Sequence, residues 1–124
     1  MISDFLWHEN PILEIDPVNE PHRLRVWRDF RVSFKLDGRD TVLTIPAGTL
    51  TDFASVPTLF QNMFPSIATH MAAAVVHDYL CISKMWTHRI AAEIFLEAMR
   101  ASRTPEAAAI VMYQAVLFGG PKWR

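Results

Sequence analysis

The stretch FRVSFKLDGRDTVLTI, residues 30–45, decides the fold because its pattern is that of two strands joined by a tight turn. In its first seven residues every second side chain is apolar, which is typical of a strand with one buried face. Asp37-Gly38 is a hairpin signal, and the residues from Thr41 onward supply the returning strand. We therefore predict an antiparallel hairpin over residues 30–46, with Arg39 and Asp40 widening its turn beyond two residues.

The chain before the hairpin divides into an alternating segment and a proline-containing one. Arg23–Trp27 alternates in polarity and predicts a further strand, so residues 23–46 are expected to be β. Prolines at positions 11, 17 and 21 fix φ and remove backbone donors. We therefore expect residues 1–22 to form an extended, irregular segment.

After the hairpin the pattern changes from a period of two to helical spacing. Ser66, Thr87 and Thr104 each stand where a side-chain oxygen can cap a helix start. We expect one helix to begin just after each of them, and the last to end at Gly119-Gly120. Strands followed by helices predict an α+β fold: a small antiparallel sheet with three C-terminal helices, within residues 66–118, packed on one face.

Length and composition predict one domain over residues 1–124 and disfavour some classes of binding partner. About half of the residues are hydrophobic (51%) and 20% are charged, as in ordinary globular proteins. A net charge of −1 disfavours non-specific nucleic-acid binding, although four arginines of the first strands offer a local basic patch. No run is long enough to span a membrane, and the acidic N-terminus lacks the pattern of a signal peptide. The single cysteine, Cys81, is expected to be a small core residue.

Four segments together resemble a phage and prophage family catalogued as domain of unknown function 1353. They are LTIPAGTLTDFASVP (43–57), AAVVHDYL (73–80), HRIAAEIFLEAM (88–99) and the closing GGPKW (119–123). The likeness runs from about Phe30 to Trp123. Thr58 stands where the family often has a basic residue, and Glu93 where an aspartate is usual. The resemblance implies a phage or prophage origin and a shared fold, and brings no established activity.

Two polar residues, Asp52 and Ser55, lie in a candidate turn, Thr51–Pro57. Side-chain oxygens of both types accept hydrogen bonds from backbone N–H groups two or three residues on, so we favour a structural role. A catalytic Ser55 would need a base, for which His77 is the candidate. The sequence contains no nucleophile-elbow motif around this serine.

The second polar feature is the adjacent pair His77 and Asp78 in the first predicted helix. Neighbouring helical side chains point about 100° apart, so one helix alone does not offer both to the same ion. A metal site would draw on separate segments: His77, Asp78, Asp52 and Glu93. In the structural alternative Asp78 lies on the apolar stripe and pairs with Arg89, while His77 hydrogen-bonds the Thr51–Pro57 turn. We favour this polar cluster, with no cofactor; one divalent ion is the alternative.

Two functions stay open at this point. The first is a phage or prophage structural or assembly accessory protein, associated with the virion tail or connector and contacting other virion proteins or itself. It would be located in the virion or the host cytoplasm. The second is a small metal-dependent hydrolase that uses the His77–Asp78 pair. We favour the first, because no complete catalytic motif is recognisable and the chain holds 8 phenylalanines and 4 tryptophans.

The tryptophans offer candidate contacts with a partner. Trp123 follows a glycine-proline break, and we expect it to fold back onto the core. The candidate exposed anchors are then Trp7, Trp27 and Trp86. Sequence alone does not choose among these three.

Overall fold

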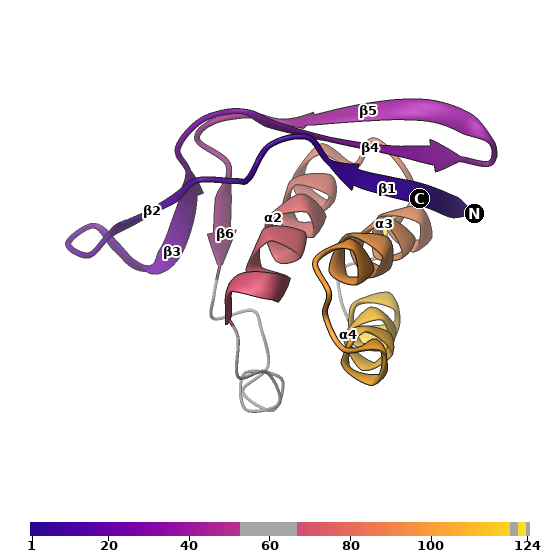
Figure 1. The fold of residues 1–124 in the computed structure, drawn as a ribbon. Helices are drawn as coiled ribbons and strands as arrows, with labels where there is room; N and C mark the ends of the chain where they lie inside the picture. Colours follow the sequence, from indigo (N-terminus) through magenta and orange to yellow (C-terminus); the bar gives the residue numbers. More distant parts are fainter. Residues whose placement is uncertain (53–66, 120–121, 124) are drawn as a thin grey trace.

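The computed structural model describes residues 1–52, 67–119 and 122–123, and for residues 20–22, Asp52 and 67–70 it describes the backbone alone. Within these residues, strands precede helices (Figure 1), so the predicted α+β class is confirmed. The elements are β1 (Ile2–Trp7), β2 (Leu13–Asp16), β3 (Glu20–Val26), β4 (Phe30–Leu36), β5 (Arg39–Ile45), β6 (Leu50–Asp52), α2 (Ile67–Ser83), α3 (His88–Ala101) and α4 (Glu106–Gly119).

The predicted hairpin is present as β4 and β5, which pair without interruption from Phe30–Ile45 to Leu36–Arg39. Its turn contains only two residues, so the expected widening was wrong. Asp37 and Gly38 have φ of 50° and 83°, as a type I′ turn requires. Aspartate tolerates positive φ and glycine adopts it freely, which allows the tight turn whose twist matches the strands. Arg39 therefore already pairs as part of β5.

The N-terminal segment is more regular than its prolines suggested. Residues 1–22, expected to be irregular, hold β1, β2 and the beginning of β3. Pro11 and Pro17 lie between strands, where no ladder hydrogen bond is lost. Pro21 lies near the start of β3, close to the register shift at Asp16. These are the positions at which a sheet accommodates proline.

The strands form two three-stranded sheets instead of the single sheet expected. The first has the order β1-β4-β5 and the second β2-β3-β6, all antiparallel. The loop between β5 and β6 is hydrogen-bonded to the end of β3: the Val26 N–H donates to the Thr49 carbonyl (2.9 Å), and the Gly48 N–H donates to the Val26 carbonyl (2.8 Å). The carboxylate of Asp29 accepts from the Ala47 N–H (2.7 Å) and fixes the same loop.

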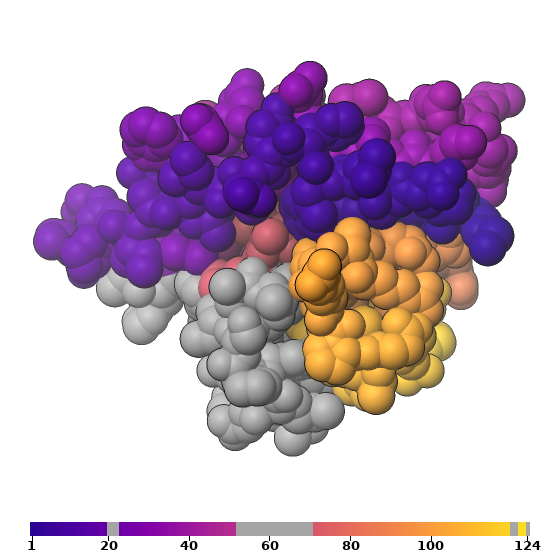
Figure 2. Space-filling model, viewed as in Figure 1, coloured from indigo at the N-terminus to yellow at the C-terminus, as the bar shows by residue number. Residues whose placement is uncertain are grey.

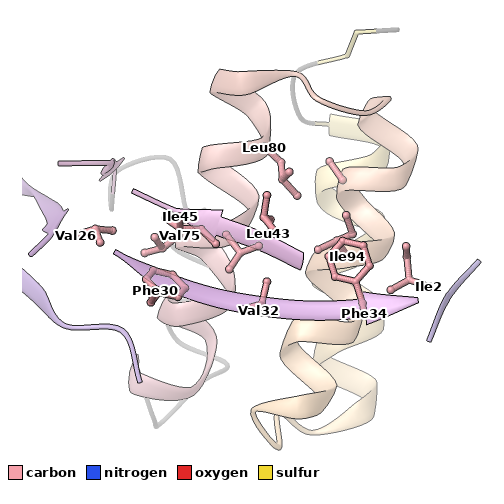
Figure 3. Close-up of a cluster of buried hydrophobic side chains, with 12 residues drawn as sticks. Ile2, Val26, Phe30, Val32, Phe34, Leu43, Ile45, Val75, Leu80 and Ile94 are labelled. Atoms are coloured by element: carbon pink, nitrogen blue, oxygen red, sulfur yellow. The ribbon is translucent and has the colours of Figure 1, made fainter. Parts of the chain in front are cut away.

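The helices lie on one side of the strands in two layers (Figure 1). Side chains of α2 and α3 meet the inner face of the first sheet in a common core (Figure 3); its members include Phe30, Val32, Leu43, Ile45, Val75, Leu80 and Ile94. Helix α4 packs on α3, where Phe95 and Met99 meet Met112. The expectation of three helices is confirmed, with α4 forming an outer layer.

The helix starts differ in how they are capped. Thr87 caps α3 as expected, with its hydroxyl oxygen accepting from the Ile90 N–H (3.3 Å). The hydroxyl of Thr104 is buried and has no hydrogen-bond partner among the described residues, so the cap predicted there is not made. Ser66 lies outside the described residues. No helix in the described ranges is long and apolar enough to cross a bilayer.

The C-terminal tail folds back as predicted. The indole N–H of Trp123 donates to the Trp86 carbonyl (2.5 Å), and the Trp123 carbonyl accepts from Nδ1 of His88 (2.8 Å). Trp123, Trp86 and Trp7 pack partly buried against the core. Of the three candidate anchors, Trp27 is the exposed one, with 59% of its surface accessible.

Candidate functional site

The second sheet meets α2 through a buried threonine. Thr51 pairs with Leu24 of β3, so the two side chains share the sheet face that carries buried residues. The hydroxyl of Thr51 donates to the carboxylate of Asp78 on α2. The prediction that the segment beginning at Thr51 meets the His77–Asp78 helix is thus confirmed at this contact, although Thr51 and Asp52 belong to β6 and not to a turn.

The rest of the predicted turn cannot be compared with the structure in the same way. Ser55 and the other residues of 53–57 lie outside the described residues, and so does the side chain of Asp52. The roles predicted for Asp52 and Ser55, and the hydrogen bond predicted between the turn and His77, therefore stay predictions.

His77 is buried, and its ring lies against Phe95 of α3. Only 9% of its surface is exposed, and its ring lies 5.2 Å, centroid to centroid, from that of Phe95. Burial lowers the pKa of this imidazole to about 4, because the charged form would lose its hydration. At neutral pH His77 is therefore an uncharged ring packed between α2 and α3.

Cys81 lies one helical turn after His77, with its sulfur 3.7 Å from both ring nitrogens. Burial first, and the charge of Asp78 second, raise the pKa of this thiol to about 11. A protonated thiol beside a neutral imidazole is not an activated nucleophile. Sequence analysis placed Cys81 in the core without relating it to His77, although the i, i+4 spacing on one helix was the available signal.

The predicted ion pair between Asp78 and Arg89 is wrong. Arg89 is exposed, and the described residues show no ion pair between it and Asp78. Helix α3 buries the stripe that contains Ala91, Ile94 and Ala98, and Arg89 lies off that stripe.

Glu93 lies apart from the His77–Asp78 pair, near the first residue of the chain. Its side chain is 4.0 Å from the ammonium group of Met1, which also pairs with the carboxylate of Asp37. Within the part of the chain that the structure describes, no three His, Cys, Asp or Glu side chains gather in a group able to hold a metal ion. The candidate set of His77, Asp78 and Glu93 is therefore not brought together, while the side chain of Asp52 is not described.

A second feature is the ribbon formed by β2 and β3, which projects beyond the helices (Figures 1 and 2). Its exposed apolar side chains, here called the ribbon patch, are Ile12, Ile15, Val18 and Trp27. The Trp27 N–H donates to the Ile12 carbonyl (2.8 Å), so these two are neighbours across the ribbon. Ile15, opposite Leu24, lies on the other face, and Val18 lies at the tip. Each face of the ribbon thus carries an exposed isoleucine, and the face of Ile12 and Trp27 also carries Glu14 and Arg25.

A sequence model of the family described as "Protein of unknown function (DUF1353)" matches residues 24–116, from β3 to α4. The chain belongs to this family. The DUF1353 match therefore includes both partners of the Thr51–Asp78 contact and excludes β1 and β2.

Two curated relatives of this DUF1353 protein come from Sinorhizobium fredii. The uncharacterized protein y4jT is 37% identical over 81 residues, which are 64% of this chain and 24% of the relative. The uncharacterized protein y4iH is 34% identical over 77 residues, which are 60% of this chain and 32% of the relative. The matched part thus spans about a quarter to a third of each relative. No solved structure matches the chain significantly.

Proposed function

We propose that this protein is a structural or assembly accessory component of a phage or prophage particle, in its tail or connector, and that it acts by protein–protein contact. The ribbon patch supports the proposal. Val18, at the tip, is 84% exposed, and Trp27 is 59% exposed on the outer face. Exposed apolar groups on a projecting element are typical of interaction sites, and tryptophan is enriched among the residues that dominate binding.

The ribbon suits insertion into a groove of a partner. Burying the exposed part of Trp27 removes on the order of 100 Å² of apolar surface from water, or about 2–3 kcal/mol. Two exposed arginines, Arg23 within β3 and Arg28 next to Trp27, supply a polar rim. The partner surface is therefore expected to be apolar at its centre, with carboxylates around it.

In this proposal the polar groups between β6 and α2 have a structural role. The Thr51–Asp78 hydrogen bond joins the second sheet, and with it the ribbon, to the helices. The metal-dependent hydrolase is less well supported by the described residues, because His77 is buried beside Phe95 and Cys81 and a catalytic group needs access to substrate.

The experiment compares particle association of three versions of the protein in a host strain that carries the prophage. Particles are purified on a density gradient, and the protein is quantified by immunoblotting. The wild type and the control Phe118→Ala, which changes an exposed apolar residue of α4, are expected to co-purify with particles. The double variant Val18→Ser, Trp27→Ala is expected to be depleted at least tenfold while retaining its circular dichroism spectrum.

A strain that lacks the gene completes the test. The proposal predicts fewer infectious particles, or particles with defective tails, from this strain. It is overturned if the protein is absent from particles and the deletion strain produces normal ones. Bound divalent metal in protein purified without a tag, together with a chelator-sensitive hydrolytic activity, would favour the hydrolase instead.

A further inference from the structure

The edges of the two sheets are not equally protected. An edge strand exposes unpaired backbone groups, and proteins discourage pairing there with bulges, short strands, prolines or covering elements. Strand β1 has a register shift at Asp4, whose φ is 53°, and β2 has one between Ile15 and Asp16. Strand β6 is only three residues long. In the described part of the chain, β5 is the edge strand without such a device.

Strand β5 is regular along its whole length. Seven consecutive residues, Arg39 to Ile45, pair with β4 without a bulge, and none of them is proline. Its side chains alternate between the buried core face and an exposed outer face. Such a strand is a template for addition of another strand.

The two-residue turn determines which backbone groups of β5 face outward. The pair flanking a turn of this type, Leu36–Arg39, is hydrogen-bonded, and hydrogen-bonded pairs then alternate along the hairpin. The N–H and C=O groups of Asp40, Val42 and Thr44 therefore point away from β4. No backbone hydrogen bond joins these three residues to another described segment. The edge thus offers three donors and three acceptors.

We propose that β5 pairs with β5 of a second copy of this chain, antiparallel and centred on Val42, so that the two first sheets form one six-stranded sheet. The two-fold axis places Val42 opposite Val42 of the second copy, and Asp40 opposite Thr44. A carboxylate then faces a hydroxyl donor at each end, and no like charges oppose each other.

The register is specified by the edge itself. Only the register centred on Val42 pairs all three outward-facing residues with one another. Moving the two-fold axis by one residue, to Thr41, places Thr44 opposite Gly38 in the turn. Moving it to Leu43 places Asp40 opposite Pro46, which has no N–H. A centre on Asp40 places two aspartates opposite each other, which is unfavourable.

The exposed side chains on the outer face of the first sheet also favour a second copy of the chain as the partner of β5. Leu6, Ser33 and Val42 form one row across the first sheet, because Ser33 pairs with both of the others. Leu6 is 60% exposed and Val42 is 64% exposed. Pairing through β5 continues this row into that of the second copy, so the exposed valines cover each other. The contact uses β5 and not the ribbon patch, and is therefore independent of the proposed function.

Sedimentation equilibrium of the full chain tests the proposal, with a monomer mass of 14.2 kDa as the reference. The wild type is expected to approach twice this mass as its concentration rises to about 0.5 mM. Val42→Pro removes an outward N–H that β4 does not use, and should raise the dissociation constant by about tenfold or more. Val42→Thr keeps that N–H and the branched shape, and is the matched control expected to dimerise.

A charge-swap pair keeps the test decisive if Val42→Pro does not fold. Val42→Lys and Val42→Glu each place like charges at the two-fold axis, so each alone should be monomeric. Their equimolar mixture should form a heterodimer, because opposite charges then meet. The proposal is overturned if the wild type is monomeric at 0.5 mM, or if the mixture of the two variants stays monomeric. A folded Val42→Pro variant that dimerises like the wild type also overturns it.

Discussion

Replacing His77 with glutamine should remove a pH-dependent part of the stability of the protein. In the folded chain burial lowers the pKa of His77 from 6.5 to about 4, whereas the unfolded chain keeps the ordinary value. Between these two pH values the unfolded state binds one proton more than the folded state. The free energy of unfolding of the wild type therefore decreases as the pH is lowered, by up to about 1.4 kcal/mol per pH unit.

The size of the effect follows from the shift. Stability due to the neutral imidazole is fully present above pH 6.5 and is lost progressively down to about pH 4. The accumulated loss is about 3 kcal/mol, a large fraction of the stability of a small domain. Glutamine does not titrate, so His77→Gln should lack this loss, although it lowers stability at neutral pH by removing the packing on Phe95.

Urea unfolding followed by tryptophan fluorescence, at pH values from 7.5 to 4, measures the effect. The quantity of interest is the difference between the wild type and His77→Gln, because all other titrating groups are common to both. The free energy of unfolding of the wild type minus that of His77→Gln should decrease by about 3 kcal/mol from pH 7.5 to pH 4. A difference that stays constant within about 0.5 kcal/mol would show that His77 is not buried as described.

Three shorter predictions concern the groups around this histidine. Arg89→Ala should change the free energy of unfolding by less than about 0.5 kcal/mol, because Arg89 is exposed; a loss of several kcal/mol would restore the ion pair with Asp78. Thr51→Val should cost about 1–2 kcal/mol in urea unfolding because the Asp78 carboxylate loses a donor, whereas Thr44→Val on the exposed face should cost little. Cys81, with its pKa raised to about 11, should react with a thiol reagent at pH 8 far more slowly in the folded protein than in urea; equal rates would contradict its burial.

The fold class could be predicted because its signals are local. Alternation on either side of Asp37-Gly38 specified the hairpin, and helical spacing with Thr87 as a cap specified α3. The division into two sheets could not be predicted, because it depends on which strands pair. Strand β2 is four residues long between two prolines, and its register shift leaves no clear alternation. Pairing between distant segments has no signature in a short window.

The candidate site was predicted in part for the same reason. The approach of Thr51 to the helix of Asp78 follows from a short connection between sheet and helices, and was foreseen. The hydrogen bond from Thr51 to Asp78 was not predicted, because Arg89 at the start of the next helix suggested an ion pair instead. The helical phase of α3 turns Arg89 outward. The contact between Cys81 and His77 was not predicted, because a lone cysteine in an apolar helix looks like any small apolar side chain; the structure shows it half-buried beside His77.

Met1 and Trp123 both lie against α3, which suits this fold to circular permutation. Glu93 lies near Met1, and Nδ1 of His88 donates a hydrogen bond to the carbonyl of Trp123. These two residues of α3 are five positions apart, about 7.5 Å along the helix axis. Two residues this close can be joined by a short linker without disturbing the core. New ends opened at the exposed Asp37-Gly38 turn would then leave β4 and β5 paired but no longer consecutive in the chain.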